Sequence, residues 1–389
     1  RSSPTSIPIT TTRMPSSDLS LTGGSQTKGL VRSSLTVDLD AIAANYRLLR
    51  DRAAPATCAA VVKADAYGLG VVHVASRLWR EGCRIFFVAS LEEAITLREV
   101  LPAAEITAFN GLLPGEATYY RAHKILPTLN DSGQIDTWAQ FCRSHEPMPA
   151  AVHLDTGMSR LGLAPADQNR LAENPERLND FDFRYLLSHL ACADTPEHPM
   201  NEQQREDFAA IADRLPTATR SLAASSGIFL GPEWHFDMVR AGISMYGGAP
   251  NATAQNPVAP VVTLNAIVLQ IRDVDRPETV GYGATYQFTG KSKVATIAAG
   301  YADGYLRSAS GQATAYSGET VLPLVGRVSM DLITLDATKA EGLSVGDTVQ
   351  LIGPQYGINE LSADAGTIPY EILTSLGHRY HRQYTGGDT

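Results

Sequence analysis

The feature that most constrains the fold is a regular alternation of short apolar runs with longer amphipathic stretches, beginning at Leu35. This alternation is typical of strand–helix units repeated around a parallel sheet. Eight strands are predicted, at 57–63, 84–89, 104–109, 125–130, 150–155, 183–189, 220–225 and 236–240, with helices at 40–50, 91–101 and 201–215. Eight units predict a (β/α)8 barrel. A doubly wound open sheet is the alternative, because the last strand is weakly marked.

The pattern changes after about Pro257. Short β-rich runs follow, separated by Gly, Pro and Asp, at 261–271, 293–297, 320–324, 332–335 and 348–351, and helical periodicity returns only at 368–376. The chain is therefore predicted to be of the α/β class, with a TIM-like (β/α)8 barrel at 35–260 and a mainly β C-terminal domain at 261–389. Residues 1–34 are dominated by Ser, Thr, Pro and Gly and are predicted to be a disordered N-terminal extension.

Charge and cysteine content narrow the classes of partner. A formal charge of −9 over 389 residues leaves no basic footprint for nucleic acid or an anionic membrane, and no apolar run has membrane-spanning length. The four cysteines lie far apart without metal-ligand spacing, at Cys58, Cys83, Cys142 and Cys192. We therefore expect a cytoplasmic protein that acts on a small molecule and holds no metal.

Lys63 ends the first predicted barrel strand and precedes a turn of small residues at 64–70. Barrel enzymes act at the carboxyl ends of their strands, and a lysine buried there has a lowered pKa, which makes its amine a nucleophile or a Schiff-base partner. The alternative is a lysine that reaches out to solvent. Tyr67, Gly68 and Gly70 in the turn suit an anionic group that lies against the backbone.

Other strand ends supply complementary groups. His189 offers an aromatic face, Arg240 a permanent cation, and Ser226 and Gly242 lie in turns able to bind phosphate. Taken singly, His189 could be structural and Arg240 could pair with a carboxylate. Together with Lys63 they suit pyridoxal phosphate, and an arginine at the pyridine nitrogen would weaken the electron sink and favour reprotonation over transamination.

Two further regions carry candidate side chains. Arg160 follows the predicted strand 150–155 and could bind a carboxylate or the phenolic oxygen of the cofactor, or merely cap a turn. In the C-terminal domain Tyr282 stands between two glycines and Tyr301 follows a glycine. A tyrosine can act as a base if a cation lies nearby, which Arg160 could provide if the two domains meet.

With these motifs assembled, the chain from about Leu35 to Tyr384 resembles the alanine racemases, a family of fold-type III pyridoxal-phosphate enzymes. The resemblance implies that Lys63 is the Schiff-base lysine and the base for the D-enantiomer, with Tyr282 as the opposite base for the L-enantiomer. It further implies a cofactor site made of Lys63, Tyr67, His189, Ser226, Arg240, Gly242, Ile243 and Tyr370. Arg160 and the Met330 backbone N–H would bind the substrate carboxylate, while His153, Asp194, Tyr301, Arg307, Arg327 and Asp331 would line the approach or support it.

The resemblance also implies a head-to-tail homodimer in which the second subunit supplies the tyrosine. The expected reaction interconverts L-alanine and D-alanine, either to supply D-alanine for peptidoglycan or to allow its catabolism. Two positions depart from the family pattern. His153 stands where many relatives carry a lysine, often carbamylated, that orients the arginine, and Ser225 stands where asparagine is common.

Four alternatives remain open at this point. The substrate could be serine or a broader set of amino acids. A pyridoxal-phosphate decarboxylase is disfavoured by Arg240, since such enzymes normally use an acidic residue there. A non-catalytic carrier of the cofactor would consist of the barrel alone. A barrel that binds phosphorylated metabolites without pyridoxal remains conceivable, because phosphate turns recur on this fold.

Overall fold

A computed structural model describes residues 31–251 and 255–387 of the chain. From Arg32 onward the described residues belong to one compact unit. Most of the extension predicted at 1–34 lies outside the described residues, but Ser33 and Ser34 are the first residues of strand β1 (Ser33–Asp38).

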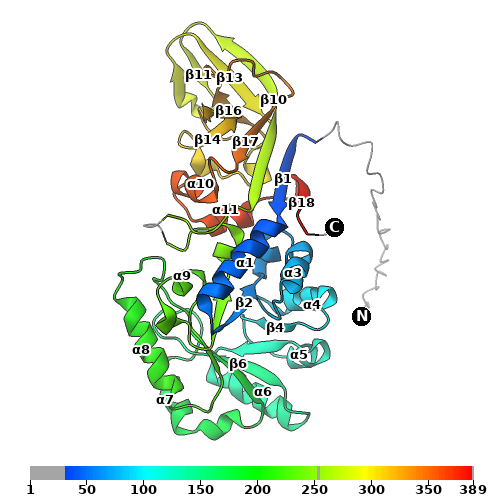
Figure 1. Cartoon of the computed structure of the whole chain (residues 1–389), viewed down its shortest axis with the longest axis vertical. Helices are drawn as coiled ribbons and strands as arrows, with labels where there is room; N and C mark the ends of the chain where they lie inside the picture. The colour runs from blue at the N-terminus through cyan, green and yellow to red at the C-terminus, as the bar shows by residue number, and fades with distance from the viewer. Residues whose placement is uncertain (1–30, 252–254, 388–389) are drawn as a thin grey trace, which may run out of the picture. The chain divides into compact units, whose positions relative to one another are not determined.

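Eight parallel strands form the first sheet, in the order β8-β7-β6-β5-β4-β3-β2-β9. The two edge strands approach one another through a bridge between Ala224 and Arg240, so the sheet curls into a nearly closed barrel (Figure 1). The predicted barrel is thus confirmed. Its strands are β2 (Thr57–Val61), β3 (Ile85–Val88), β4 (Glu105–Ala108), β5 (Leu126–Leu129), β6 (Pro149–His153), β7 (Asp182–Leu187), β8 (Thr219–Ser221) and β9 (Met238–Ala241).

Helices cover the outside of the barrel and begin at polar caps that the sequence supplies. The Asp38 carboxylate accepts the backbone N–H groups of Asp40 and Ala41 at 2.9 Å, and Asp131 accepts that of Gln134 at the same distance. The helices of this half are α1 (Leu39–Ala53), α2 (Lys63–Gly68), α3 (Val71–Arg80), α4 (Leu91–Val100), α5 (Ala117–His123), α6 (Ser132–Arg143), α7 (Pro165–Glu173), α8 (Met200–Ala212) and α9 (Ser225–Ile228).

The second sheet is mainly antiparallel and has the order β15-β14-β17-β10-β1-β18, with β13 added beside β10 and β16 beside β13. Its long central strand β10 (Val262–Val274) alternates buried with less buried residues, as a strand with one covered face requires. The remaining strands of this half are β11 (Glu278–Val280), β12 (Tyr286–Phe288), β13 (Ser292–Ile297), β14 (Thr314–Ser317), β15 (Thr320–Pro323), β16 (Ile333–Asp336), β17 (Thr348–Ile352) and β18 (His381–Thr385), with helices α10 (Ile358–Asp364) and α11 (Pro369–Ser375).

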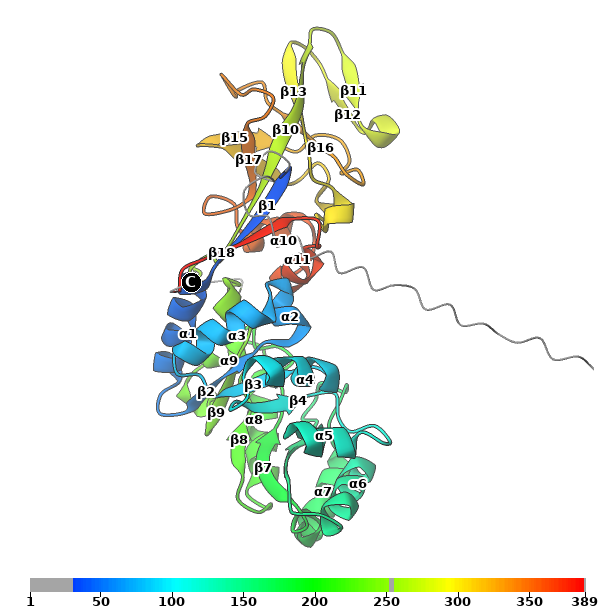
Figure 2. The same cartoon turned by 90° about the vertical axis from the view of Figure 1, so that its right-hand side faces the viewer.

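Strand β1 precedes the barrel in the chain but belongs to the second sheet. It pairs antiparallel with β10 and parallel with β18, and Figure 2 shows β1 beside the long β10. The predicted barrel range therefore opens with a strand whose partners lie more than two hundred residues away, for example Leu35 opposite Leu264.

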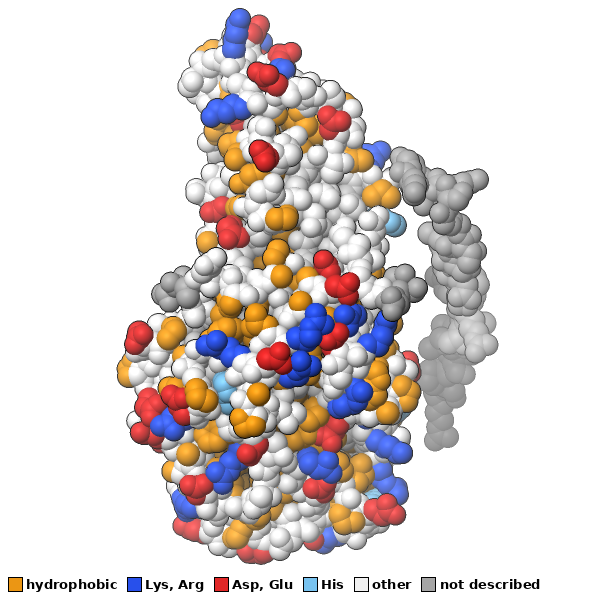
Figure 3. All heavy atoms as spheres, in the orientation of Figure 1, with side chains coloured by type: hydrophobic (Ala, Val, Ile, Leu, Met, Phe, Trp, Pro, Cys, Tyr) orange, Lys and Arg blue, Asp and Glu red, His pale blue; other side chains and the backbone are white. Residues whose placement is uncertain are grey.

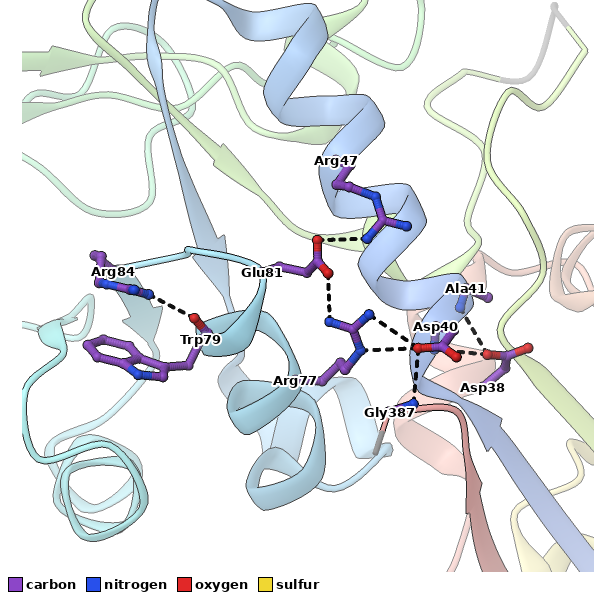
Figure 4. A network of polar contacts seen from close by, with 9 residues as sticks. All are labelled: Asp38, Asp40, Ala41, Arg47, Arg77, Trp79, Glu81, Arg84 and Gly387. Carbon is purple, nitrogen blue, oxygen red and sulfur yellow. Dashed lines mark hydrogen bonds and ion pairs between the residues drawn. The ribbon is translucent and has the colours of Figure 1, made fainter. Parts of the chain in front are cut away.

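A polar network anchors the end of β18 to the helices of the barrel (Figure 4). Arg77 of α3 forms ion pairs with Asp40 at 3.2 Å and with Glu81 at 2.8 Å, and Arg47 of α1 reaches Glu81 at 2.7 Å. The Asp40 carboxylate also accepts the backbone N–H of Gly387 at 3.0 Å. The last described residues are therefore fixed to α1 and α3.

Charged side chains are interspersed over the surface. On the face in Figure 3, Lys and Arg side chains lie among Asp and Glu side chains over the barrel helices. Among the helices that the structure describes, none is both long and apolar enough to span a membrane.

Candidate active site

Lys63 leaves the barrel at the carboxyl end of β2 and begins a turn of unusual handedness. Four consecutive residues, Ala64, Asp65, Ala66 and Tyr67, have φ between 52° and 58°. This left-handed conformation costs about 1–2 kcal/mol per residue for side chains other than glycine. Such strain persists only where surrounding contacts impose it, and it is concentrated at functional sites.

The Lys63 amine has the electrostatic properties expected of a reactive group. Its side chain is half-buried, and burial is the main cause that lowers its pKa, followed by the positive charge of Arg160. Arg240 lowers the pKa further, while Glu93 opposes the shift. A lowered pKa leaves more of the amine unprotonated and nucleophilic.

Arg240 lies on β9, next to β2 in the sheet, and is almost completely buried. Its guanidinium donates to the carbonyl and hydroxyl oxygens of Ser221 at 2.8 and 2.7 Å and to the Ser188 carbonyl at 2.6 Å. No carboxylate pairs with it among the described residues, so the ion-pair alternative is not met. Burial lowers the pKa of Arg240 to about 10, which still leaves it charged at neutral pH.

His189 stands beside this guanidinium at the end of β7. Its Nδ1 lies 3.4 Å from Nη2 of Arg240. Because an arginine only donates hydrogen bonds, Nδ1 is the acceptor and the ring proton resides on Nε2. Burial, and then the charges of Arg240 and Arg160, lower the pKa of His189 to about 3, so the ring is neutral at physiological pH.

His153, at the end of β6, is also held neutral. Its Nδ1 lies 2.8 Å from Oδ1 of Asn130, and the Asn130 amide nitrogen donates to the carbonyls of Phe109 and Thr128 at 2.9 and 3.1 Å. These two bonds orient the Asn130 amide, so its oxygen faces His153 and the histidine carries its proton on Nδ1. Burial, and then Arg240, lower the pKa of His153 to about 4.

A tyrosine cluster forms the floor next to the Lys63 turn. The ring of Tyr67 stacks on Tyr246 with centroids 4.6 Å apart and lies 5.9 Å from Tyr370. The Tyr67 hydroxyl is so close to Gly242 that a Cβ built there would be 2.7 Å from it, which explains why glycine occupies this position. Tyr246 in turn donates to the Val61 carbonyl at 2.9 Å and supports the end of β2.

The turn around Gly242 is organised by Ser225, noted above only as a departure from the asparagine common in the family. The buried Ser225 hydroxyl accepts the N–H of Gly242 at 2.9 Å and that of Ser244 at 3.2 Å. Ile243 opens the following buried 3-10 turn (Ile243–Tyr246). The predicted contact of the Gly242 N–H with a phosphate remains a prediction, since Ser225 occupies that donor here.

A cavity of about 830 Å³ opens beside His189 and Tyr246. Its volume is within the size range of small-molecule and cofactor sites. Its lining includes His189, Ser226, Tyr370 and Asp194. Burial, and then the Asp194 carboxylate, raise the pKa of Tyr370 to about 12. Arg160, exposed after β6, lines a smaller neighbouring cavity together with His153 and His189.

Tyr282 lies elsewhere, on the surface of the mainly β half. It begins a 3-10 turn (Tyr282–Ala284) between Gly281 and Gly283, whose φ values of 72° and 74° are left-handed, and its side chain is 70% exposed. Among the described residues, no hydrogen bond, ion pair or ring contact joins it to Lys63. The structure thus separates the two predicted bases within one chain.

Arg327, another predicted residue of this half, lies next to the turn of Tyr282. A Cβ at Gly283 would lie 3.2 Å from the Arg327 guanidinium, and the loop that follows Arg327 pairs with Tyr301, whose N–H donates to the Ser329 carbonyl at 3.0 Å. The Met330 carbonyl accepts the N–H of Ala302 at 2.9 Å.

Asp331, another predicted residue, has a local ion-pair partner. The carboxylate of Asp331 pairs with Arg379 at 2.7 Å, and the same arginine pairs with buried Asp303 at 2.9 Å. Arg307 is exposed and begins the 3-10 turn Arg307–Ala309.

Comparisons with known proteins place the chain. Residues 37–250 match the family model of the alanine racemase N-terminal domain, and residues 261–384 match that of the C-terminal domain. The alanine racemase of Rhodospirillum rubrum is 47% identical over 357 residues, which cover 90% of this chain and 96% of the relative. That of Brucella abortus is 46% identical over 375 residues, covering 91% and 95%.

Solved structures of alanine racemases resemble the fold of this chain. Alanine racemase from Bartonella henselae with covalently bound pyridoxal phosphate has a TM-score of 0.88 at 42% identity and covers 91% of this chain and 99% of that one. The biosynthetic alanine racemase of Pseudomonas aeruginosa has a TM-score of 0.86 at 33% identity, covering 92% and 100%. The resemblance inferred from the sequence motifs is confirmed: the chain belongs to the alanine racemase family.

Proposed function

We propose that this protein is a pyridoxal-phosphate-dependent alanine racemase that interconverts L-alanine and D-alanine. The observation that carries the proposal is that Lys63 follows β2 and Arg240 lies on the neighbouring strand β9, at the carboxyl end of the same barrel. Lys63 is a half-buried amine with a lowered pKa, and Arg240 is a buried cation on the adjacent strand with no carboxylate partner among the described residues. A pyridoxal enzyme that must return a proton to its substrate needs both.

The residues present fit the cofactor. Buried Arg240 has no anionic partner in the described part of the chain and can donate to a ring nitrogen. The Tyr67 hydroxyl leaves no room for a Cβ at Gly242, as in a tight phosphate cradle. The pKa values of Lys63, His153 and His189 are all lowered in part by neighbouring arginines, a field that favours anionic groups such as a phosphate and a carboxylate.

Each predicted contact has a place in such a site. Lys63 would attach the cofactor covalently. Arg240 would face the ring nitrogen of the cofactor, and His189 would lie against the face of its ring. The phosphate would be held by Tyr67, Ser226, Gly242, Ile243 and Tyr370. When bound, the cofactor draws electrons from the substrate Cα and makes its proton removable.

The protein groups then decide where the proton goes. Lys63, with its lowered pKa, can take or return the Cα proton on one face. The Tyr282 hydroxyl would act on the opposite face, with the exposed Arg160 and the Met330 N–H holding the carboxylate. Arg240 only donates hydrogen bonds and keeps its proton, so it would not pass one to the ring nitrogen.

The position of Tyr282 supports a head-to-tail homodimer. A base that is 70% exposed and has no contact with Lys63 in its own chain is suited to serve the site of a second copy. Exposed apolar side chains accompany it on the same half, at Tyr301, Met330 and Leu332, and others lie near the barrel mouth, at Leu161, Ile368 and Tyr370. Exposed apolar groups of this kind are typical of interfaces.

The substrate, location and role complete the proposal. We expect alanine as the substrate, a cytoplasmic location, and a role in either the supply or the catabolism of D-alanine. The test is incubation of the holoenzyme with L-Ala, L-Ser, L-Lys and L-Arg separately, followed by chiral chromatography. D-alanine as the only product supports the proposal. D-serine or several D-amino acids would instead identify a racemase of broader specificity, and no D-product at all would reject racemase activity.

A further inference from the structure

The backbone amide that follows Lys63 is bound by a side chain from the next strand–helix unit. The N–H of Ala64 donates to Oε1 of Glu93 at 2.7 Å, and Oε2 accepts the N–H of Ala89, also at 2.7 Å. Glu93 lies in the first turn of α4, and Ala89 follows β3. One carboxylate therefore joins the ends of β2 and β3, at the point where Lys63 leaves the sheet.

This bond reaches the turn at its strained beginning. Ala64, with φ 52° and ψ 50°, is the first of the four left-handed residues. Later amides of the turn are bound from within the same segment: Ala66 donates to the Val62 carbonyl and Gly70 to the Asp65 carbonyl, both at 2.9 Å. The amide of Ala64 is instead held from another element, and Glu93 supplies the acceptor.

Glu93 also acts on Lys63 through its charge. Its carboxylate raises the pKa of Lys63, whereas burial, Arg160 and Arg240 lower it. The position of Glu93 at the start of α4 suits a carboxylate, because the helix dipole favours negative charge there. The same side chain is thus both a mechanical anchor for the turn and a counter-charge for the amine.

We propose that Glu93 is a positioning residue for Lys63: by binding the Ala64 amide it holds the left-handed turn and so sets the direction of the lysine amine. Its two contacts are backbone amides, and it acts through the turn rather than on reacting atoms. Supporting contacts of this kind fix the geometry of an active-site group. The inference rests on the proposed function, since the task of Lys63 there is to attach pyridoxal phosphate.

The two functions of the carboxylate can be separated by two variants. Glu93→Asp keeps the charge but shortens the reach by one methylene, whereas Glu93→Gln removes the charge, keeps the length and leaves one acceptor oxygen, enough for one of the two backbone amides. Glu92→Gln is the matched control, because Glu92 lies exposed in the same helical turn. Each purified full-length protein is stripped of cofactor and mixed with pyridoxal phosphate across a range of pH. The growth of the visible band is followed, and reductive trapping at Lys63 is confirmed by mass spectrometry.

The expected results differ between the variants. Glu93→Asp should attach the cofactor roughly ten to a hundred times more slowly, the effect of losing a hydrogen bond to a charged group, with the pH midpoint unchanged. Glu93→Gln should move the midpoint of the pH dependence downward, because a counter-charge to the lysine is lost. Glu92→Gln should behave as the wild type does.

The contrary outcomes are distinct. Wild-type rates and wild-type pH midpoints in both Glu93 variants would overturn the role of Glu93 and leave the proposed function intact. A wild-type protein that takes up no pyridoxal phosphate at all would overturn the proposed function itself. If Glu93→Gln shows no cooperative thermal transition, Glu93→Asp decides alone: a normal attachment rate in that variant rejects the inference.

Discussion

Oδ1 of Asn130 accepts the Nδ1 proton of His153 across 2.8 Å, and this bond fixes the tautomer of the histidine. The lone pair of Nε2 is left as an acceptor, on a ring that lines the same small cavity as Arg160. At position 153 this chain therefore has a neutral hydrogen-bond acceptor, where the carbamylated lysine of many relatives would carry a negative charge. Asn130 was not among the residues singled out in the sequence, because a buried asparagine between two strand ends gives no local signal.

Changing this partner should make the enzyme sensitive to acid. Asn130→Asp places a carboxylate on Nδ1 and should raise the pKa of His153 above its value of about 4, because a negative partner favours the imidazolium. Below the new pKa the ring is charged, with Arg160 and Arg240 nearby. We expect kcat/KM for alanine to fall severalfold at acidic pH and to recover at alkaline pH.

The control for this change is Asn174→Asp, which adds the same charge at an exposed residue after α7. Its pH profile should match that of the wild type. Coincident profiles for Asn130→Asp and wild type would show that the Asn130–His153 bond does not govern the charge of the ring.

Acid should also weaken the fold itself. His153 and His189 have folded pKa values of about 4 and about 3, below the ordinary value of 6.5. As pH falls from 6.5 towards 4, these two histidines become protonated in the unfolded chain but stay neutral in the folded chain. The free energy of unfolding therefore rises with pH across this window and levels off above it. The slope is at most about 1.4 kcal/mol per pH unit for each histidine.

Denaturant unfolding of the cofactor-free protein at several pH values measures this slope. His153→Gln should remove its share of the dependence while leaving that of His189. A free energy of unfolding that stays constant between pH 4 and 6.5 would be incompatible with two neutral histidines in the folded site.

Two variants that each lack one base should regain activity when one chain of each forms a mixed dimer. Lys63→Ala and Tyr282→Phe each damage one base, and a head-to-tail dimer joins the lysine of one chain to the tyrosine of the other. A mixed dimer then contains one intact site and one doubly altered site. The purified mixed dimer should have about half of the wild-type activity, since one of its two sites is intact.

The measurement is racemase activity after co-expression with two different affinity tags and tandem purification. Lys63→Ala alone should also lack the visible band of lysine-bound pyridoxal phosphate. Mixed dimers with no more activity than either parent would indicate that both bases come from the same chain.

Gly242→Ala tests the cradle next to Tyr67. The new Cβ would lie 2.7 Å from the Tyr67 hydroxyl, and overpacking of this kind costs about 1–3 kcal/mol. Tyr67 must shift off Tyr246, and the affinity for pyridoxal phosphate should fall by about tenfold or more. Gly290→Ala is the control, because no atom lies within 4 Å of a Cβ there. Equal cofactor affinities in the two variants would remove Tyr67 from the phosphate site.

The barrel strands were predictable because each is a buried apolar run with clear ends. All eight predicted ranges overlap β2 to β9, and even the weakly marked last range contains most of Met238–Ala241. The short strands β11, β12 and β14, with three or four residues each, carry no such run, and α10 was missed as well. Strand β1 was assigned to the barrel range because nothing in its own sequence reveals partners so distant.

The site was predictable to a similar degree. Strand-end positions brought Lys63, His189 and Arg240 to one rim, as expected from barrel topology. The left-handed turn was not foreseeable, since Ala64 and Ala66 have no intrinsic preference for positive φ. Likewise Ser225 and Asn130 acquire their roles only from hydrogen bonds across the fold.

The placement of β1 between β10 and β18 also bears on biosynthesis. Ser34 faces His381 in the parallel pair, so a strand translated before the barrel acquires its second neighbour only after β18 has been made. On the ribosome, the backbone N–H and C=O groups of β1 stay unpaired while the whole barrel is synthesised. Domains fold as they emerge, and pairing between residues far apart in the chain forms late. A chain cut short before His381 would leave this inner strand as an exposed edge, and nascent chains stalled there are natural targets for chaperones and proteases.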